Sequence, residues 1–359
     1  ALQPPAGLRA GVIAGLCLLA TACGGDAADP VTTTLEPRPV TTASVTEAVP
    51  VLAEFDVQGH RGARGLKPEN TLPAFETALD LGVSTLELDL HFTSDGEVVV
   101  WHDAAIEREK CGLAPDAPPG LPDPDDVLVP EPDRLIAGLT SAQLAGYRCD
   151  RNPSESTYPD QTSDPTALAG ADYRIVTLGE LFDFVAAYRE SPDKTDDQRT
   201  GAAGVLFNVE TKRKPDRPET IGDGFDGIRA GPFELAILAE IADRGLGDRV
   251  IIQSFDHRSL WAVHAEDPAV KLAALSSRES VDLSELAARG ASIWSPNRQV
   301  LDRDSLERAH DVGLEVIPWT VNDPTEMADL IAVGVDGLIS DRPDLLLDVV
   351  TEVRNRAGE

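Results

Sequence analysis

The chain has 359 residues, a length that suits two average domains or one barrel of about 250 residues with additions. It contains 31 Lys and Arg against 62 Asp and Glu, so its formal net charge at pH 7 is −31. This excess of acid argues against a partner held by many phosphate contacts, which excludes nucleic-acid binding. A hydrophobic share of 42% and a charged share of 26% are typical of a globular protein.

Residues 1–22 have the pattern of a secretory signal peptide. An apolar run, residues 11–22, follows Arg9 and is too short to cross a membrane. Its end, residues 19–25, resembles a bacterial lipoprotein box in which Cys23 receives lipid after cleavage. An ordinary signal peptide, whose small residues only satisfy the peptidase, is the alternative. We therefore expect a secreted lipoprotein on the outer face of the cytoplasmic membrane.

Residues 23–53 follow the cleavage site and are rich in Thr, Pro and Ala without a regular period. We expect them to form a flexible tether behind the lipidated Cys23. Cys17 would leave with the signal, so Cys111 and Cys149 are the remaining pair. In an oxidising compartment this pair predicts a disulfide.

Residues 54–354 alternate short apolar strands with segments of helical period. The helical segments are residues 71–81, 177–188, 232–244, 284–289, 302–312 and 325–332. The predicted strands are residues 54–58, 85–91, 204–210, 249–254, 270–275, 291–294, 315–320 and 336–340. Eight such units predict an α/β fold of the (β/α)8 TIM barrel type.

A further apolar segment, residues 97–101, follows the second strand after a turn of three residues. So short a turn joins antiparallel strands, and we expect a hairpin that folds His102 over the barrel mouth. Residues 104–172 form a long proline-rich insertion after the second barrel strand, with a short helix near residues 141–147. Loops of this length are usually functional or disordered, and the cysteines in this one favour order.

Carboxylates alternate with leucines along the second strand. Glu87, Asp89 and His91 face one way and the leucines the other, which is also the pattern of a half-exposed strand. Both faces of a barrel strand are covered, so inward carboxylates need a cation or another partner, and a hard divalent ion meets that need. In the third strand Glu210 is a candidate third ligand and Lys212 a cation for an anionic substrate, with a plain ion pair as the alternative.

Two histidines follow strand ends near this face. His60 and Arg61 lie in a glycine-rich loop after the first strand. A histidine can move a proton near neutral pH, and an arginine can fork onto a phosphate. His102, at the end of the hairpin, supplies a second ring, and Asp103 beside it is able to fix its tautomer.

Together these segments resemble the glycerophosphodiester phosphodiesterase family over residues 56–347. The motifs that carry the resemblance fall at strand ends: His60-Arg61-Gly62, Glu69-Asn70-Thr71, Glu87-x-Asp89, His102-Asp103, Glu210-x-Lys212, Gln253-Ser254-Phe255, Trp319-Thr320-Val321-Asn322, and residues 336–343.

The resemblance implies a phosphodiesterase that releases sn-glycerol 3-phosphate and an alcohol from glycerophosphodiesters. The implied site residues are the acid–base pair His60 and His102, the ligands Glu87, Asp89 and Glu210 of one Ca²⁺ or Mg²⁺ ion, the phosphate contacts Arg61 and Lys212, and the substrate-binding residues Glu69, Phe255 and Trp319. As alternatives, Glu69 orients Arg61, and the two aromatic side chains belong to the core.

Two other functions remain open. Sphingomyelinase D toxins look like a branch of the same superfamily and also hold this loop with a disulfide, so a lipid-directed phospholipase D is one alternative. The insertion lacks the aromatic clusters and basic runs that dock on a bilayer, which favours small glycerophosphodiesters. The other is a non-catalytic solute-binding lipoprotein, for which paired histidines are not required. Headgroup preference, the choice of metal, the attacking group and the oligomeric state stay open.

Overall fold

The structure is a computed structural model that describes residues 55–277 and 281–358. The predicted signal peptide (1–22), the lipidated Cys23 and the tether (23–53) lie outside the described residues. Within the described part of the chain, no helix combines the length and the apolar character needed to cross a bilayer.

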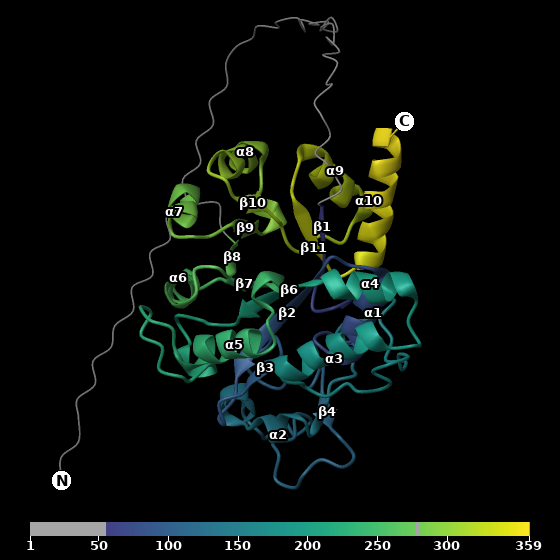
Figure 1. Cartoon of the computed structure of the whole chain (residues 1–359). Helices are drawn as coiled ribbons and strands as arrows, with labels where there is room; N and C mark the ends of the chain where they lie inside the picture. The colour runs from purple at the N-terminus through teal and green to yellow at the C-terminus, as the bar shows by residue number, and fades with distance from the viewer. Residues whose placement is uncertain (1–54, 278–280, 359) are drawn as a thin grey trace, which may run out of the picture. The chain divides into compact units, whose positions relative to one another are not determined.

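The described residues contain a nearly closed barrel of eight parallel strands, which confirms the predicted fold class (Figure 1). Backbone bonds from Asp336 N to Val316 O (3.0 Å) and from Ile339 N to Pro318 O (3.1 Å) link the two ends of the row. The carboxyl ends of all strands therefore meet at one mouth. Around the barrel the strands are β10 (Glu315–Val316), β9 (Ile293–Pro296), β8 (Lys271–Ser276), β7 (Val250–Ser254), β6 (Leu206–Thr211), β2 (Thr85–Phe92), β1 (Asp56–Gly59) and β11 (Gly337–Ser340).

Helices follow the strands along the chain. Six lie in the predicted segments: α1 (Leu72–Leu81), α3 (Leu178–Glu190), α5 (Pro232–Asp243), α7 (Leu283–Ala288), α8 (Arg303–Asp311) and α9 (Pro324–Val333). The structure adds α4 (Asp196–Gly204), α6 (His257–Glu266) and α10 (Pro343–Gly358). Only Ala202 of α4 is buried, so this helix has no apolar period that sequence analysis could detect.

Alternation along the strands separates two apolar layers. Leu86, Leu88 and Leu90 of β2 are fully buried in the cluster between barrel and helices. Neighbouring residues of β7 point to opposite faces in the same way. Ile252 belongs to the cluster between barrel and helices, and Ile251 belongs to a second, smaller cluster on the other face of the strands. The face of β2 that carries Glu87, Asp89 and His91 is therefore the inner face, as predicted.

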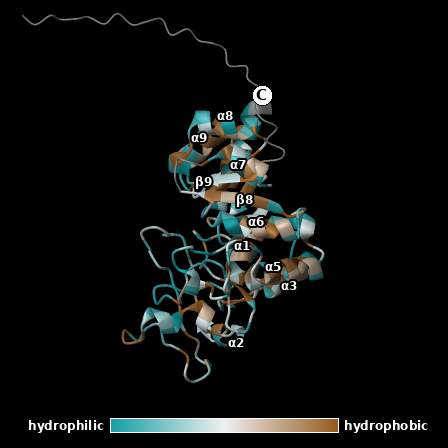
Figure 2. Ribbon diagram, turned by 90° about the vertical axis from the view of Figure 1, so that its left-hand side faces the viewer, coloured by the Kyte–Doolittle hydropathy of each residue, from teal (hydrophilic) through white to brown (hydrophobic). Residues whose placement is uncertain are grey.

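The hairpin and the insertion are both ordered. β3 (Val98–Val100) pairs antiparallel with β2, as predicted. The insertion contains α2 (Ser141–Leu144) and a small sheet of β4 (Gly112–Leu113) and β5 (Tyr147–Arg148). The helix is shorter than predicted because the chain enters β5 at Tyr147. Figure 2 shows hydrophilic and hydrophobic stretches along the loops of the insertion near α2. The insertion also has a buried cluster that includes Ile136 and Tyr147.

The predicted disulfide between Cys111 and Cys149 closes the insertion beside the small sheet. Both cysteines are buried within the cluster of the insertion. The bond links residues 38 positions apart. It therefore closes a large loop in the unfolded chain and lowers the conformational entropy of that state.

We expect the double variant Cys111→Ser/Cys149→Ser to have a lower free energy of unfolding by about 4 kcal/mol, from the chain-entropy model for a loop of this size. Denaturant-induced unfolding of the oxidised protein and the variant measures the difference. The reduced parent protein serves as the control and should unfold at the same denaturant concentration as the variant. Equal midpoints, together with two free thiols detected by alkylation and mass spectrometry, would contradict the bond.

Candidate active site

A tight loop after β1 carries the first catalytic candidates to the barrel mouth. Arg61 and Asn70 both adopt left-handed backbone conformations, with φ of 52° and 56°. Gly62 has φ of 86°, and a Cβ there would lie 2.6 Å from the backbone of Ala74, so this position needs glycine. The Arg61 amide donates to Glu87 Oε2 at 2.9 Å, which ties the loop to β2.

His60 is held by a carboxylate from the neighbouring strand. Its Nδ1 lies 2.5 Å from Asp341 Oδ1, and Asn322 donates to the other oxygen at 2.8 Å. Burial and the charge of Arg61 lower the pKa of His60, while Asp341 opposes them. Burial works to raise the pKa of Asp341, but His60 and Arg64 hold it below its usual value. Because an ionised carboxylate only accepts hydrogen bonds, Nδ1 carries the proton, and Nε2 lies 3.9 Å from Glu87 Oε2, too far for a hydrogen bond.

Asp341 is a functional candidate to which sequence analysis assigned no role. It directly follows β11, which pairs with β1. The sequence shows that Asp341 follows a strand. Its position beside His60 follows only from the pairing of β11 with β1 in the closed barrel.

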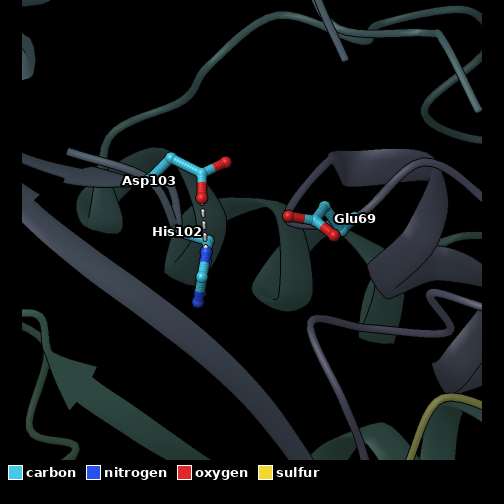
Figure 3. A group of neighbouring side chains, drawn as sticks. All are labelled: Glu69, His102 and Asp103. Atoms are coloured by element: carbon cyan, nitrogen blue, oxygen red, sulfur yellow. Dashed lines mark hydrogen bonds and ion pairs between the residues drawn. The ribbon is translucent and has the colours of Figure 1, made fainter. Parts of the chain in front are cut away.

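His102 has a carboxylate partner of its own. Its Nδ1 lies 2.8 Å from Asp103 Oδ1, and Figure 3 shows the second ring nitrogen pointing away from this carboxylate. Burial lowers the pKa of His102 to about 4. His91, fully buried, lies with Nε2 3.1 Å from the His102 carbonyl and so fixes the backbone that carries the ring. His91 therefore has a structural role in this part of the chain.

Glu87, Asp89 and Glu210 bring their carboxylates together inside the mouth. Each offers an oxygen, and these oxygens lie within 4.8 Å of one another. Burial and the other two carboxylates raise the pKa of Glu87 well above its usual range, and burial raises that of Glu210 to about 7. For Asp89, burial also acts to raise the pKa, but Lys212 and Arg61, together with the two histidines, hold it well below its usual value.

This cluster fits a hard divalent cation. Asp89 and Glu210 both raise the pKa of Glu87, and Asp89 also raises that of Glu210, so positive charge is strongly favoured in this buried group. Lys212 supplies part of that charge, since its Nζ lies 2.9 Å from Glu210 and 3.3 Å from Asp89. An all-oxygen donor set of this kind suits Ca²⁺ or Mg²⁺.

Arg61 is fixed from two sides. Its Nη1 donates to Glu69 Oε1 at 2.9 Å, and its Nε lies 3.1 Å from Asp89. Glu69 is buried behind the arginine and does not line the cavity. This position fits the alternative in which Glu69 orients Arg61.

The mouth encloses a cavity of about 150 Å³ with a polar and an apolar side. The apolar side includes Phe255 and Trp319, whose rings meet edge to face at 5.4 Å. Both aromatic residues therefore line the cavity, although Trp319 also packs on the inner apolar cluster. The lining residues are His60, Arg61, Glu87, His102, Glu210, Lys212, Gln253, Phe255, Leu275, Trp319, Thr320 and Ile339.

Comparisons with known proteins agree on one family. The model of the glycerophosphoryl diester phosphodiesterase family matches residues 60–345. The glycerophosphodiester phosphodiesterase of Caldanaerobacter subterraneus subsp. tengcongensis is 28% identical over 296 residues, which cover 82% of this chain and 97% of the relative.

Solved structures share the fold. A putative glycerophosphoryl diester phosphodiesterase from Silicibacter pomeroyi DSS-3 has a TM-score of 0.66 at 25% identity, covering 83% of this chain and 94% of that one. A phosphodiesterase from Oleispira antarctica, solved with its product sn-glycerol-3-phosphate, has a TM-score of 0.60 at 19% identity, covering 82% and 96%.

A TIM barrel whose mouth joins two histidines, three carboxylates and two cations, in a chain with these relatives, defines a phosphoric diester hydrolase. The chain belongs to the glycerophosphoryl diester phosphodiesterase family.

The raised pKa values of Glu87 and Glu210 make metal affinity depend on pH. A protonated carboxyl must lose its proton before it binds a cation, so affinity for Ca²⁺ or Mg²⁺ should rise with pH through about 7. We expect up to about tenfold per pH unit for each proton released. Isothermal titration calorimetry in buffers of different ionisation enthalpy measures both quantities.

Glu210→Gln provides the comparison for this experiment. The variant should bind the cation more weakly and release fewer protons, because its amide does not titrate. An affinity for the parent protein that stays constant across this pH range would show that neither carboxyl holds a proton there.

Proposed function

We propose that this chain hydrolyses glycerophosphodiesters to sn-glycerol 3-phosphate and an alcohol, with His60 and His102 as the acid–base pair. One observation carries the proposal: both rings line a single small cavity, and each has its Nδ1 on a carboxylate. Arg61 and Lys212 line the same cavity and suit an anionic substrate.

The charge of the site matches the needs of phosphoryl chemistry. Arg61 and Lys212 would bind the non-bridging oxygens of the diester and balance the charge that grows during attack. A divalent cation held by Glu87, Asp89 and Glu210 would act there as a Lewis acid.

Proton transfer would use the free Nε2 atoms. One histidine would accept the proton of the attacking oxygen, and the other would donate a proton to the departing alcohol. Burial leaves both rings neutral near pH 7, and a bound phosphate anion would favour protonation of the ring beside it. The attacking oxygen belongs either to water or to the neighbouring glycerol hydroxyl.

Small diesters fit the site better than intact lipids. The cavity of about 150 Å³ favours a short glycerophosphate with a soluble headgroup. Phe255 and Trp319 would contact the carbon skeleton of the substrate. A phospholipase D or sphingomyelinase D-like activity is the second candidate, because the closed insertion lies next to the second histidine.

We expect the mature protein to release sn-glycerol 3-phosphate from glycerophosphocholine or glycerophosphoethanolamine and to lose this activity on chelation. His60→Ala and His102→Ala should each lower kcat by about 10²- to 10⁴-fold, the usual contribution of acid–base transfer. A coupled assay for glycerol 3-phosphate measures the rates.

His310→Ala is a matched control, because this partly exposed ring pairs with Asp336, which precedes β11, and does not line the cavity. It should retain the parent rate. Full turnover after chelation or in His60→Ala would reject the mechanism. A headgroup panel with lysophospholipids and sphingomyelin decides between the two candidate substrates, since faster turnover of the lipids would favour the second.

We further propose that Cys23 carries a lipid that tethers the enzyme to the outer face of the cytoplasmic membrane. The support is the box-like pattern of residues 19–25 behind an apolar run. Palmitate labelling of a bacterial host that expresses the full chain should mark the parent protein and not Cys23→Ala, which should shift from the membrane fraction to the soluble fraction. Equal labelling of both proteins would contradict the anchor.

A further inference from the structure

Two carboxylates outside the proposed metal site come close together beside His102. Glu69, Asp103 and His102 each offer an atom within 4.8 Å of the others, and Figure 3 shows the two acids on either side of a small gap. Glu69 is buried and Asp103 is partly exposed, with 25% of its side chain exposed, and two carboxylates this close repel each other unless a cation lies between them.

Lys110 is that cation. Its Nζ donates to Glu69 Oε1 at 2.7 Å and also bonds Asp103 Oδ2. The ammonium therefore contacts both acids directly, and Arg64 Nε lies 2.5 Å from the second oxygen of Glu69, so the group has positive charge without a second metal ion. The lysine is largely buried, with 13% of its side chain exposed, and its Nζ lies 5.6 Å from the ring centre of Trp101.

Each acid held by Lys110 supports a different residue of the active site. Glu69 accepts from Arg61 through the same oxygen that accepts from Lys110. Asp103 uses one oxygen for Lys110 and the other for His102. Lys110 is thus connected through one carboxylate to Arg61, which would bind phosphate, and through the other to His102, the proposed acid–base residue.

Lys110 comes from the insertion, next to its disulfide. Cys111 follows it directly and is bonded to Cys149. The Lys110 carbonyl accepts from the Arg151 amide at 3.1 Å, so the backbone is held on both sides of the bridge. The insertion therefore presents this one ammonium in a fixed place at the barrel mouth.

We propose that Lys110 is a positioning residue of the active site that acts through two carboxylates, Asp103 for His102 and Glu69 for Arg61. The inference deepens the proposed function and rests on it for its kinetic test. It gives the insertion a catalytic purpose, which is to orient the second histidine and the phosphate-binding arginine together.

The first variant is Lys110→Met, which keeps an unbranched apolar side chain at this position and removes the charge. We expect kcat/KM to fall by about 10- to 100-fold, as for other residues that orient catalytic groups. Lys110→Arg should recover most of the loss, because a guanidinium also donates to two carboxylates. Parent values of kcat and KM in Lys110→Met would overturn the proposal.

Lys67→Met is the matched control. Lys67 lies in the same loop as Glu69 and also bonds the insertion, donating to Thr162 Oγ1 at 3.0 Å and to the Asp164 carbonyl at 2.9 Å. It contacts neither carboxylate. An equal loss of activity in Lys67→Met would mean that Lys110 only helps to keep the insertion in place, and would overturn the proposal.

Two double-mutant cycles separate the two routes. In an Asp103→Asn background, Lys110→Met should no longer lower kcat, and in a Glu69→Gln background it should no longer raise KM. Additive effects in both backgrounds would show that the lysine does not act through these acids.

A spectroscopic measurement separates failure of this inference from failure of the proposed function. The Nδ1–H of His102, hydrogen-bonded to Asp103, should give a downfield proton resonance that is assigned by its loss in His102→Gln. Lys110→Met should shift or broaden it, while Lys67→Met should leave it unchanged. If the protein hydrolyses no glycerophosphodiester, the proposed function fails, yet this resonance still tests the lysine. An unchanged resonance in Lys110→Met would overturn the proposal.

Discussion

Mutual repulsion among Glu87, Asp89 and Glu210 is the constraint on which the rest of the barrel mouth depends. Adjacent strands β2 and β6 place these carboxylates on the inner face, where burial strengthens every charge interaction. Without nearby positive charge such a group of buried carboxylates would be strongly destabilising. Lys212 and Arg61 meet that need directly, and the same charge arrangement suits a cation and an anionic diester.

The compensation extends outward as an alternating series of charges. Arg61 lies between Asp89 and Glu69, Glu69 contacts Lys110, and Lys110 contacts Asp103, which holds His102. Each charged group in this series therefore has an oppositely charged neighbour. The insertion has its own buried cluster, and it contributes Lys110 to this series of charges. It is thereby connected to the site.

The barrel was predictable from the sequence, because the periods of its strands and helices are local patterns. The candidate site residues came from strand ends and from the family resemblance, and the structure brings most of them to one cavity. Alternation in β2 identifies the inner face, and strand ends identify the mouth. Asp341 gains a role only from the pairing of β11 with β1, which is a property of the closed barrel. Lys110 lies 41 residues from Glu69 in a segment without a regular period, so no local signal marks it. The helix α4 escaped detection for the same reason.

The acidic net charge of the chain is compatible with a phosphodiester as the proposed substrate, because charge acts at two length scales. The formal charge of −31 belongs to the whole chain, and salt screens exposed charges beyond about 8 to 10 Å. Inside the mouth, Arg61 and Lys212 act at contact distance and are screened far less. A polyanion would need a broad basic surface, whereas one small diester needs only these few buried cations. On the proposed function, recognition of the substrate would therefore be decided by the pairing of groups within the cavity and would depend little on the charge outside it.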